Sequence, residues 1–115
     1  MKDLIVDGMA IAPGVVETIV SIAVNDVDGV ASVGSHATSG IRSALAGKPS
    51  TQGIDVEVDD NDELHVTVHV EVYYGYVLPD LADAIRQAVD QAVASQVGLD
   101  VGSIDVFVDG LQFAN

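Results

Sequence analysis

The sequence contains no cysteine or tryptophan and very few basic residues. Without cysteine it can form neither a disulfide nor a thiolate metal site, which fits a reducing compartment. Its 115 residues include 4 lysines and arginines against 18 aspartates and glutamates, a formal charge of −14. Nucleic-acid binding needs basic side chains that neutralise phosphates, and an anionic lipid surface repels an acidic protein. We therefore predict no nucleic-acid partner and no direct membrane insertion.

The chain also lacks a long uninterrupted apolar run, although 49% of its residues are hydrophobic. A membrane-spanning helix needs about 20 mostly apolar residues, and acidic residues interrupt the N-terminal stretch where a signal peptide would lie. We therefore expect a cytoplasmic protein. A chain of this length is typical of one domain, and its apolar content suffices for a core. We predict a single domain over residues 1–115.

Two segments show the apolar spacing of amphipathic helices. The first begins at Pro13, because proline suits the first helical turn. Its predicted buried face consists of Val16, Ile19, Val20, Ala23 and Val27, widened by Val15 and Ile22. The second helix begins at Pro79 and stops at Gly98. Its predicted buried face consists of Leu81, Ala82, Ile85, Val89, Ala92, Val93 and Val97.

Strands are indicated where aliphatic and polar residues alternate, since alternation separates them onto two faces. Residues 54–58 and 64–73 alternate around an acidic turn and predict a hairpin. Residues 104–109 predict a last strand, with Ile104, Val106 and Val108 facing inward. Shorter strands are expected within Leu4–Ile11, as one edge strand, and at Val30–Val33.

These elements predict an α+β fold. The economical arrangement is a two-layer sandwich, in which two long amphipathic helices pack on one face of a small mixed β-sheet. The outer face of the sheet then stays open to solvent. Residues at about 34–53 are rich in glycine, serine and threonine. They predict a flexible loop with one helical turn at Ile41–Leu45.

The order of these elements, together with three short motifs, resembles the alkaline shock protein family of Gram-positive bacteria. The motifs are Tyr74-Gly75 at the end of the long strand, Gly98-Leu99 after the second helix, and the final run Val106-Phe107-Val108-Asp109-Gly110-Leu111-Gln112-Phe113. The stretches "IAPGVVETIVSIAVNDVDGVASV" and "GKPSTQGIDVEV" are also similar to the family's N-terminal half. The resemblance covers nearly the whole chain, without the polar tails that members typically carry.

The resemblance implies a non-enzymatic protein of the cell-envelope stress response. It would be a scaffold or adaptor acting through protein–protein contacts, held at the membrane by a membrane-anchored partner or assembling with itself. No catalytic residues are established for the family, so none can be carried over to this chain. We predict no catalytic site, no cofactor and no metal. The alternative is a regulatory or small-ligand binding module that affects lipid or acetyl-CoA carboxylase homeostasis.

The polar face of the long strand is the predicted partner contact. It consists of His65, Thr67, His69, Glu71 and Tyr73, with Phe107 from the last strand. Aromatic side chains among polar ones favour protein contacts, and an open sheet face that meets only water is the evenly weighted alternative. Nearby carboxylates should raise the pKa of both histidines, which would make such a contact pH-sensitive.

A metal site on this face is the less favoured hypothesis. His65 and His69 lie four residues apart, about 13 Å along a strand, so the two cannot share one metal ion. Either one can ligate a metal together with cross-strand carboxylates. The acidic turn Asp59–Glu63 lacks the glycine and the final glutamate of an EF-hand loop. We therefore expect that turn to be simply solvated.

Three tyrosines lie in the stretch "VYYGYVLP", Val72–Pro79. Strand parity places Tyr73 on the outer face and Tyr74 on the covered face. Tyr76 comes after the corner, near the second helix. We therefore predict a strand-to-helix corner here, with Tyr73 as its only contact candidate.

Overall fold

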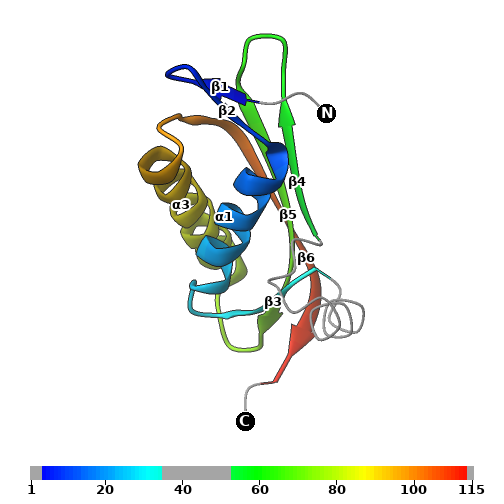
Figure 1. Cartoon of the computed structure of the whole chain (residues 1–115). Coiled ribbons are helices and arrows are strands. Elements are labelled where there is room, and N and C mark those ends of the chain that lie inside the picture. Colours follow the sequence, from blue (N-terminus) through cyan, green and yellow to red (C-terminus); the bar gives the residue numbers. More distant parts are fainter. Residues whose placement is uncertain (1–3, 35–52, 114–115) are drawn as a thin grey trace.

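The computed structural model describes residues 4–34 and 53–113. Apart from its end glycines, the predicted loop at about 34–53 lies outside the described residues, as does the helical turn at Ile41–Leu45. Figure 1 shows the arrangement of the elements. In chain order they are β1 Leu4–Val6, β2 Met9–Ile11, α1 Pro13–Asn25, β3 Val30–Val33, β4 Ile54–Val58, β5 Leu64–Tyr73, α3 Leu78–Gln96 and β6 Val101–Gln112. The predicted α+β class is confirmed.

The N-terminal segment forms a small hairpin, not the single edge strand expected for Leu4–Ile11. Strands β1 and β2 pair antiparallel, with Val6 opposite Met9. The two residues between them, Asp7 and Gly8, have φ angles of 50° and 78°. Two consecutive positive φ angles are typical of the type I′ turn, which asparagine or aspartate followed by glycine favours. The Asp-Gly pair therefore closes a separate two-stranded sheet.

Strand β5 lies at the centre of the larger sheet. It pairs antiparallel with β4, as the predicted hairpin requires, and parallel with β6, so the sheet is mixed. Strand β3 pairs antiparallel with the far end of β5. The N–H of Gly34 donates to the His69 carbonyl at 2.8 Å, and the N–H of His69 donates to the Gly53 carbonyl at 2.8 Å. The backbone N–H and the carbonyl of His69 point to the same edge of β5. Strands β3 and β4 therefore lie end to end along that edge.

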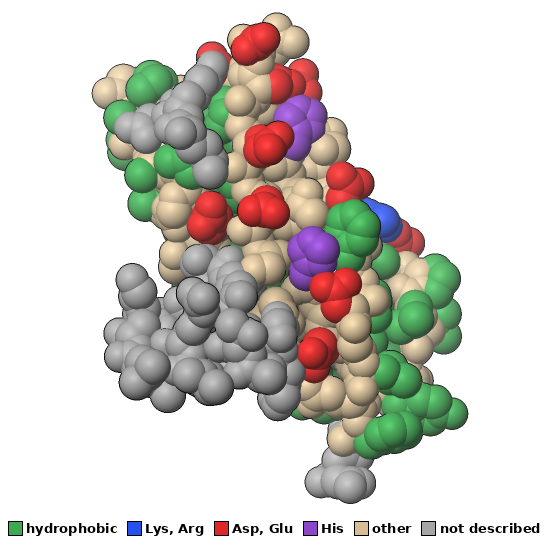
Figure 2. Space-filling view, turned by 90° about the vertical axis from the view of Figure 1, so that its right-hand side faces the viewer, with side chains coloured by type: hydrophobic (Ala, Val, Ile, Leu, Met, Phe, Trp, Pro, Cys, Tyr) green, Lys and Arg blue, Asp and Glu red, His purple; other side chains and the backbone are tan. Residues whose placement is uncertain are grey.

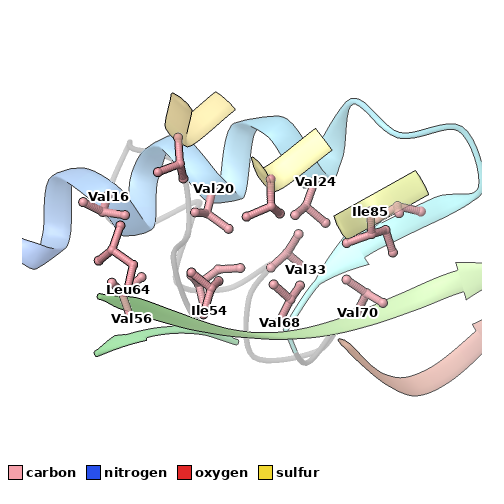
Figure 3. Close-up of a cluster of buried hydrophobic side chains, with 14 of the residues drawn as sticks. Val16, Val20, Val24, Val33, Ile54, Val56, Leu64, Val68, Val70 and Ile85 are labelled. Carbon is pink, nitrogen blue, oxygen red and sulfur yellow. The ribbon is translucent and has the colours of Figure 1, made fainter. Parts of the chain in front are cut away.

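Both helices lie on the same side of the larger sheet in Figure 1. The predicted alternation of β5 is confirmed, because its five aliphatic residues are all buried. Figure 3 shows Val16, Val20 and Val24 of α1 pointing toward these strands. The buried positions of α3 are Leu81, Ile85, Val89 and Val93. The core is therefore built almost entirely from valine, leucine and isoleucine side chains.

The predicted width of the buried face of α1 was wrong. Val15 and Ile22 are 50% and 53% exposed, while Val24 and Ser21 are buried instead. The spacing Val16, Val20, Val24 is four residues each time and follows one narrow stripe of the helix. Val15 and Ile22 lie beside that stripe and remain on the solvent side.

Strand β6 meets the core less completely than its sequence suggested. Ile104 and Val106 are partly buried against the core, but Val108 is 41% exposed. A register shift follows Val108, since Val70 pairs with Val108 and Glu71 pairs with Gly110. Asp109 is therefore the extra residue of a β-bulge. Val108 was predicted to face inward, but the part of the sheet where it lies is incompletely covered.

Candidate functional site

The side of the larger sheet turned away from the helices is here called the outer face. Its central row is the polar half of β5, flanked by residues of β4 and β6 in register. Figure 2 shows two histidine side chains among carboxylates on this side of the molecule. The outer face comprises His65, Thr67, His69, Glu71 and Tyr73 of β5, Asp55 and Glu57 of β4, and Ser103, Asp105 and Phe107 of β6.

An aromatic pair occupies the middle of the outer face. His69 and Phe107 are register partners on β5 and β6. Their rings stack with centroids 4.8 Å apart and 12° between the planes. His69 Nδ1 also lies 2.8 Å from Asp109 Oδ2, a carboxylate that the bulge of β6 presents. Phe107 is 49% exposed, so the stacked pair presents an aromatic surface to solvent.

A second histidine lies at the end of the outer face, next to the β4–β5 turn. His65 Nε2 is 2.8 Å from Asp59 Oδ2, and its Nδ1 is 2.8 Å from Ser103 Oγ. The hydrogen bond to Asp59 raises the pKa of His65, as expected from the sequence. The same bond, together with the backbone N–H of Glu63, lowers the pKa of Asp59. The two side chains therefore form an ion pair when His65 is protonated.

Glu71 of the outer face contacts residues near the end of β6. Gln112 Nε2 donates to Glu71 Oε1 at 2.7 Å. A Cβ at Gly110 would lie 2.9 Å from Glu71 Cγ, so only glycine leaves room for that side chain. Tyr73 is partly buried and is the register partner of Gln112. Of the six predicted contact residues, Phe107 is therefore the most exposed aromatic one.

One of the two carboxylates that approach the histidines differs from those expected. Cross-strand partners were expected, and for His69 this holds, because Asp109 belongs to the neighbouring strand β6. For His65 the carboxylate is Asp59, which comes from the turn that precedes β5. Asp59, Glu63 and His65 offer ligand atoms that all lie within 4.8 Å of one another. The sequence contained a signal for this group, because Asp59 and Glu63 are the first and last residues of a five-residue turn, and His65 follows two residues after Glu63.

An exposed apolar group that the sequence reading missed lies where β5 and β6 end. Tyr74, Leu111 and Phe113, here called the terminal patch, are 66%, 52% and 74% exposed. The rings of Tyr74 and Phe113 are 5.4 Å apart, and the N–H of Tyr74 donates to the Gln112 carbonyl at 2.7 Å. Tyr74 was predicted to be covered, and this was wrong. Its strand parity matches that of buried Val72, but the helices do not cover this end of the sheet.

The corner between β5 and α3 is held by Tyr76. A Cβ at Gly29 would lie 2.7 Å from the Tyr76 ring, so the ring rests directly on the glycine backbone. Gly29 has a φ of 103°, and its carbonyl accepts the N–H of Tyr73 at 2.8 Å. Tyr76 therefore serves the packing of the corner, which agrees with the structural role predicted for this stretch.

Neither α1 nor α3, the helices within the described parts of the chain, is long and apolar enough to cross a bilayer. This matches the sequence reading of the apolar runs.

Comparison with known proteins adds relatives from two bacteria. The chain is 28% identical to the uncharacterized protein YqhY of Bacillus subtilis, over 90% of this chain and 76% of the relative. It is 24% identical to the uncharacterized protein Spy1535 of Streptococcus pyogenes, over 90% of this chain and 78% of the relative. It is also 24% identical to the uncharacterized protein YloU of Bacillus subtilis, over 66% of this chain and 62% of the relative.

Solved structures of another protein have a similar fold. A variant of MamM aligns with a TM-score of 0.51 and 15% identity, covering 89% of this chain and 88% of that one. A variant of the MamM CTD gives the same TM-score and identity, covering 86% of this chain and 95% of that one. At this identity the likeness concerns the fold alone.

The family model that matches the chain covers residues 3–113, almost its full length. It describes the alkaline shock protein 23 family, with a cell envelope-related function. This confirms the resemblance seen in the motifs of the long strand, the second helix and the last strand. The chain therefore belongs to the alkaline shock protein 23 family.

Proposed function

We propose that this protein is a non-enzymatic scaffold or adaptor of the cell-envelope stress response, and that its outer face binds a protein partner. The family's cell envelope-related function supports the setting. The proposal treats the helices and the larger sheet as two layers, so that no third layer covers the outer face. The observation that carries it is the half-exposed ring of Phe107, stacked on His69 among carboxylates.

Aromatic side chains at the centre of a polar surface are typical anchors of protein interfaces. Phe107 is flanked by His69 and lies near acidic side chains of the outer face. Because the chain carries a formal charge of −14, the complementary surface should be basic around an apolar pocket. Electrostatic complementarity of this kind speeds association and selects partners.

A membrane-anchored partner suits this chemistry best. The acidic chain should be repelled by anionic lipid headgroups, and neither described helix can span the bilayer. A second protein that carries basic residues beside a membrane anchor would overcome both obstacles. A scaffold can also assemble with itself. Two copies could bind through the aromatic pair only in an orientation that keeps their carboxylates apart.

The experiment is capture from solubilised membranes of the native cells, with the full chain as bait. Wild-type protein should enrich one specific membrane protein, and Phe107→Ala should reduce its recovery by about tenfold, the effect of losing an interface anchor. Phe113→Ala is the matched control, because Phe113 is 74% exposed but belongs to the terminal patch. Recovery of soluble metabolic enzymes alone would contradict the proposal.

A regulatory module that binds a small ligand is the second candidate, and a groove between the helices favours it. The groove measures about 430 Å³, within the range of small-molecule sites. Ile19 and Ile22 of α1 and Ala92 of α3 line it. Titration with a short-chain fatty acid should then shift the amide signals of Ile22 and Ala92. Unchanged spectra at saturating ligand would leave only the adaptor function.

A further inference from the structure

The turn between β4 and β5 brings together three side chains that commonly bind metal ions. Asp59, Glu63 and His65 each contribute one ligand atom, and these atoms lie within 4.8 Å of one another. Two oxygens and one nitrogen form a mixed donor set. In a tetrahedral zinc site with bonds of about 2.0–2.1 Å, neighbouring ligand atoms lie about 3.3 Å apart. Small side-chain rotations are therefore sufficient to surround one ion.

The orientation of His65 matches that of a metal-bound histidine. Its Nδ1 lies 2.8 Å from Ser103 Oγ on β6, while its Nε2 points at Asp59 Oδ2, 2.8 Å away. Metal-ligating histidines almost always donate their second ring N–H to an oxygen outside the ligand set, which fixes the ring. With Nδ1–H donated to Ser103, the lone pair of Nε2 faces the carboxylates.

Backbone hydrogen bonds orient the Asp59 carboxylate, and a bulge in β6 leaves room for that of Glu63. Asp59 Oδ1 accepts the backbone N–H groups of Asn61 and Glu63, at 2.8 and 3.0 Å, which directs Oδ2 toward His65. A Cβ at Gly102 would lie 2.8 Å from Glu63 Oε2. Gly102 is the extra residue of a register shift between β5 and β6, so the bulge makes room for the Glu63 carboxylate.

The local charge favours a cation strongly. Glu57 is the register partner of His65, and the turn itself reads Asp59-Asp60-Asn61-Asp62-Glu63. None of the four basic residues of the chain lies between positions 49 and 85. A concentrated negative field of this kind raises the local concentration of divalent cations.

We propose that Asp59, Glu63 and His65 bind one divalent transition-metal ion of the Zn²⁺ type, with Ser103 positioning the imidazole and water completing the coordination. The ring nitrogen selects Zn²⁺-like ions over Ca²⁺ and Mg²⁺, which prefer oxygen ligands. The ion takes the place of the proton shared by His65 and Asp59. Its open position faces solvent at the edge of the outer face.

The chain supplies its own controls. His69 is also on β5, points to the same face and has a carboxylate partner in Asp109 at 2.8 Å. It lies about 13 Å from His65 along the strand, so it cannot join this site. His36 lies outside the described residues. The variants His69→Gln and His36→Gln therefore test whether binding depends on His65 in particular.

The experiment is calorimetric titration of the chelator-treated full chain with ZnCl₂. Wild-type protein should bind one ion per chain, and His65→Gln and Glu63→Gln should each weaken binding at least tenfold, while Ser103→Ala weakens it about tenfold. Both control histidine variants should bind within about twofold of wild type. A paramagnetic Co²⁺ titration should broaden the ring signals of His65 before those of His69.

Glu63 is exposed, so Glu63→Gln keeps the test valid even if His65→Gln disturbs the turn. Unfolding curves of each variant check the fold. No saturable binding to wild type up to about 1 mM Zn²⁺, binding that survives His65→Gln and Glu63→Gln, or displacement of Zn²⁺ by equimolar Ca²⁺ would each overturn the proposal.

Discussion

His69 stacks on Phe107, with ring centroids 4.8 Å apart and 12° between the ring planes. The imidazole is also held at its edge by Asp109, whose Oδ2 lies 2.8 Å from Nδ1. A side chain fixed by two neighbours loses little further freedom when a partner binds. Such preorganisation strengthens binding without adding contacts, and it makes this pair the centre of the proposed interface.

Replacing Ile85 by alanine should lower the free energy of unfolding by about 2–5 kcal/mol, because a fully buried side chain leaves a cavity. Ile85 is 0% exposed on α3. Ile22→Ala is the matched control on α1, where the side chain is 53% exposed, and it should change stability by less than about 0.5 kcal/mol. Urea unfolding measures both. Equal losses would contradict the described core.

Gly29→Ala should destabilise the protein more than Gly75→Ala. Both glycines have positive φ angles, 103° and 107°, so alanine is strained at either position by about 1–2 kcal/mol. Only at Gly29 would the new Cβ also meet the Tyr76 ring, at 2.7 Å, which adds about 1–3 kcal/mol. Thermal unfolding of the two variants compares them. A similar melting temperature for both would show that Tyr76 does not rest on Gly29.

Glu17→Gln should stabilise the protein at pH 7 but not at acidic pH. Burial and the nearby charge of Asp55 raise the pKa of Glu17 in the folded state. The charged form is therefore less favourable in the folded chain than in the unfolded one, and the penalty applies above the raised folded pKa. It disappears below the unfolded value of about 4.3. The urea midpoints of wild type and Glu17→Gln at pH 7 and pH 3.5 measure this penalty. A larger difference between the two proteins at pH 3.5 than at pH 7 would contradict the raised pKa of Glu17.

Moderate salt should raise the melting temperature. The chain carries a formal charge of −14, and folding brings these like charges closer together. Screening shortens the range of repulsion to about 8 Å at 0.15 M salt. A melting temperature that stays flat or falls between low salt and about 0.15 M NaCl would show that net repulsion does not limit stability.

The main elements could be predicted from the sequence because their patterns are regular. The aliphatic half of β5 alternates without exception from Leu64 to Val72 and is fully buried. The predicted starts at Pro13 and Pro79 lie within one residue of those of α1 and α3. Where the burial pattern is this strict, local sequence and tertiary packing agree.

The errors came where burial depends on what covers a face. Parity placed Tyr74 beside Val72, but the helices do not cover the end of the sheet, and Tyr74 is 66% exposed. Ile22 is apolar, yet it lies beside the stripe of α1 that meets the sheet. A pattern predicts which side a residue occupies and not how far the covering layer reaches.

The pairing of side chains across elements was the least accessible part of the site. His65 and Ser103 are separated by 38 positions, and His69 and Asp109 by 40. Both contacts depend on the parallel register of β5 and β6 and on two bulges in it. Nothing in a single sequence specifies such a register. The hairpin of β1 and β2, in contrast, could have been predicted from its Asp-Gly pair.

The central claim, that the outer face binds a protein partner at the cell envelope, is tested most directly by photocross-linking in the native cells. A photoreactive phenylalanine analogue at position 107 replaces Phe107 on the outer face. The same analogue at position 15 replaces Val15, which is 50% exposed on α1. The account predicts one specific envelope protein cross-linked from position 107 and not from position 15. The same products from both positions, or products from position 15 alone, would contradict it.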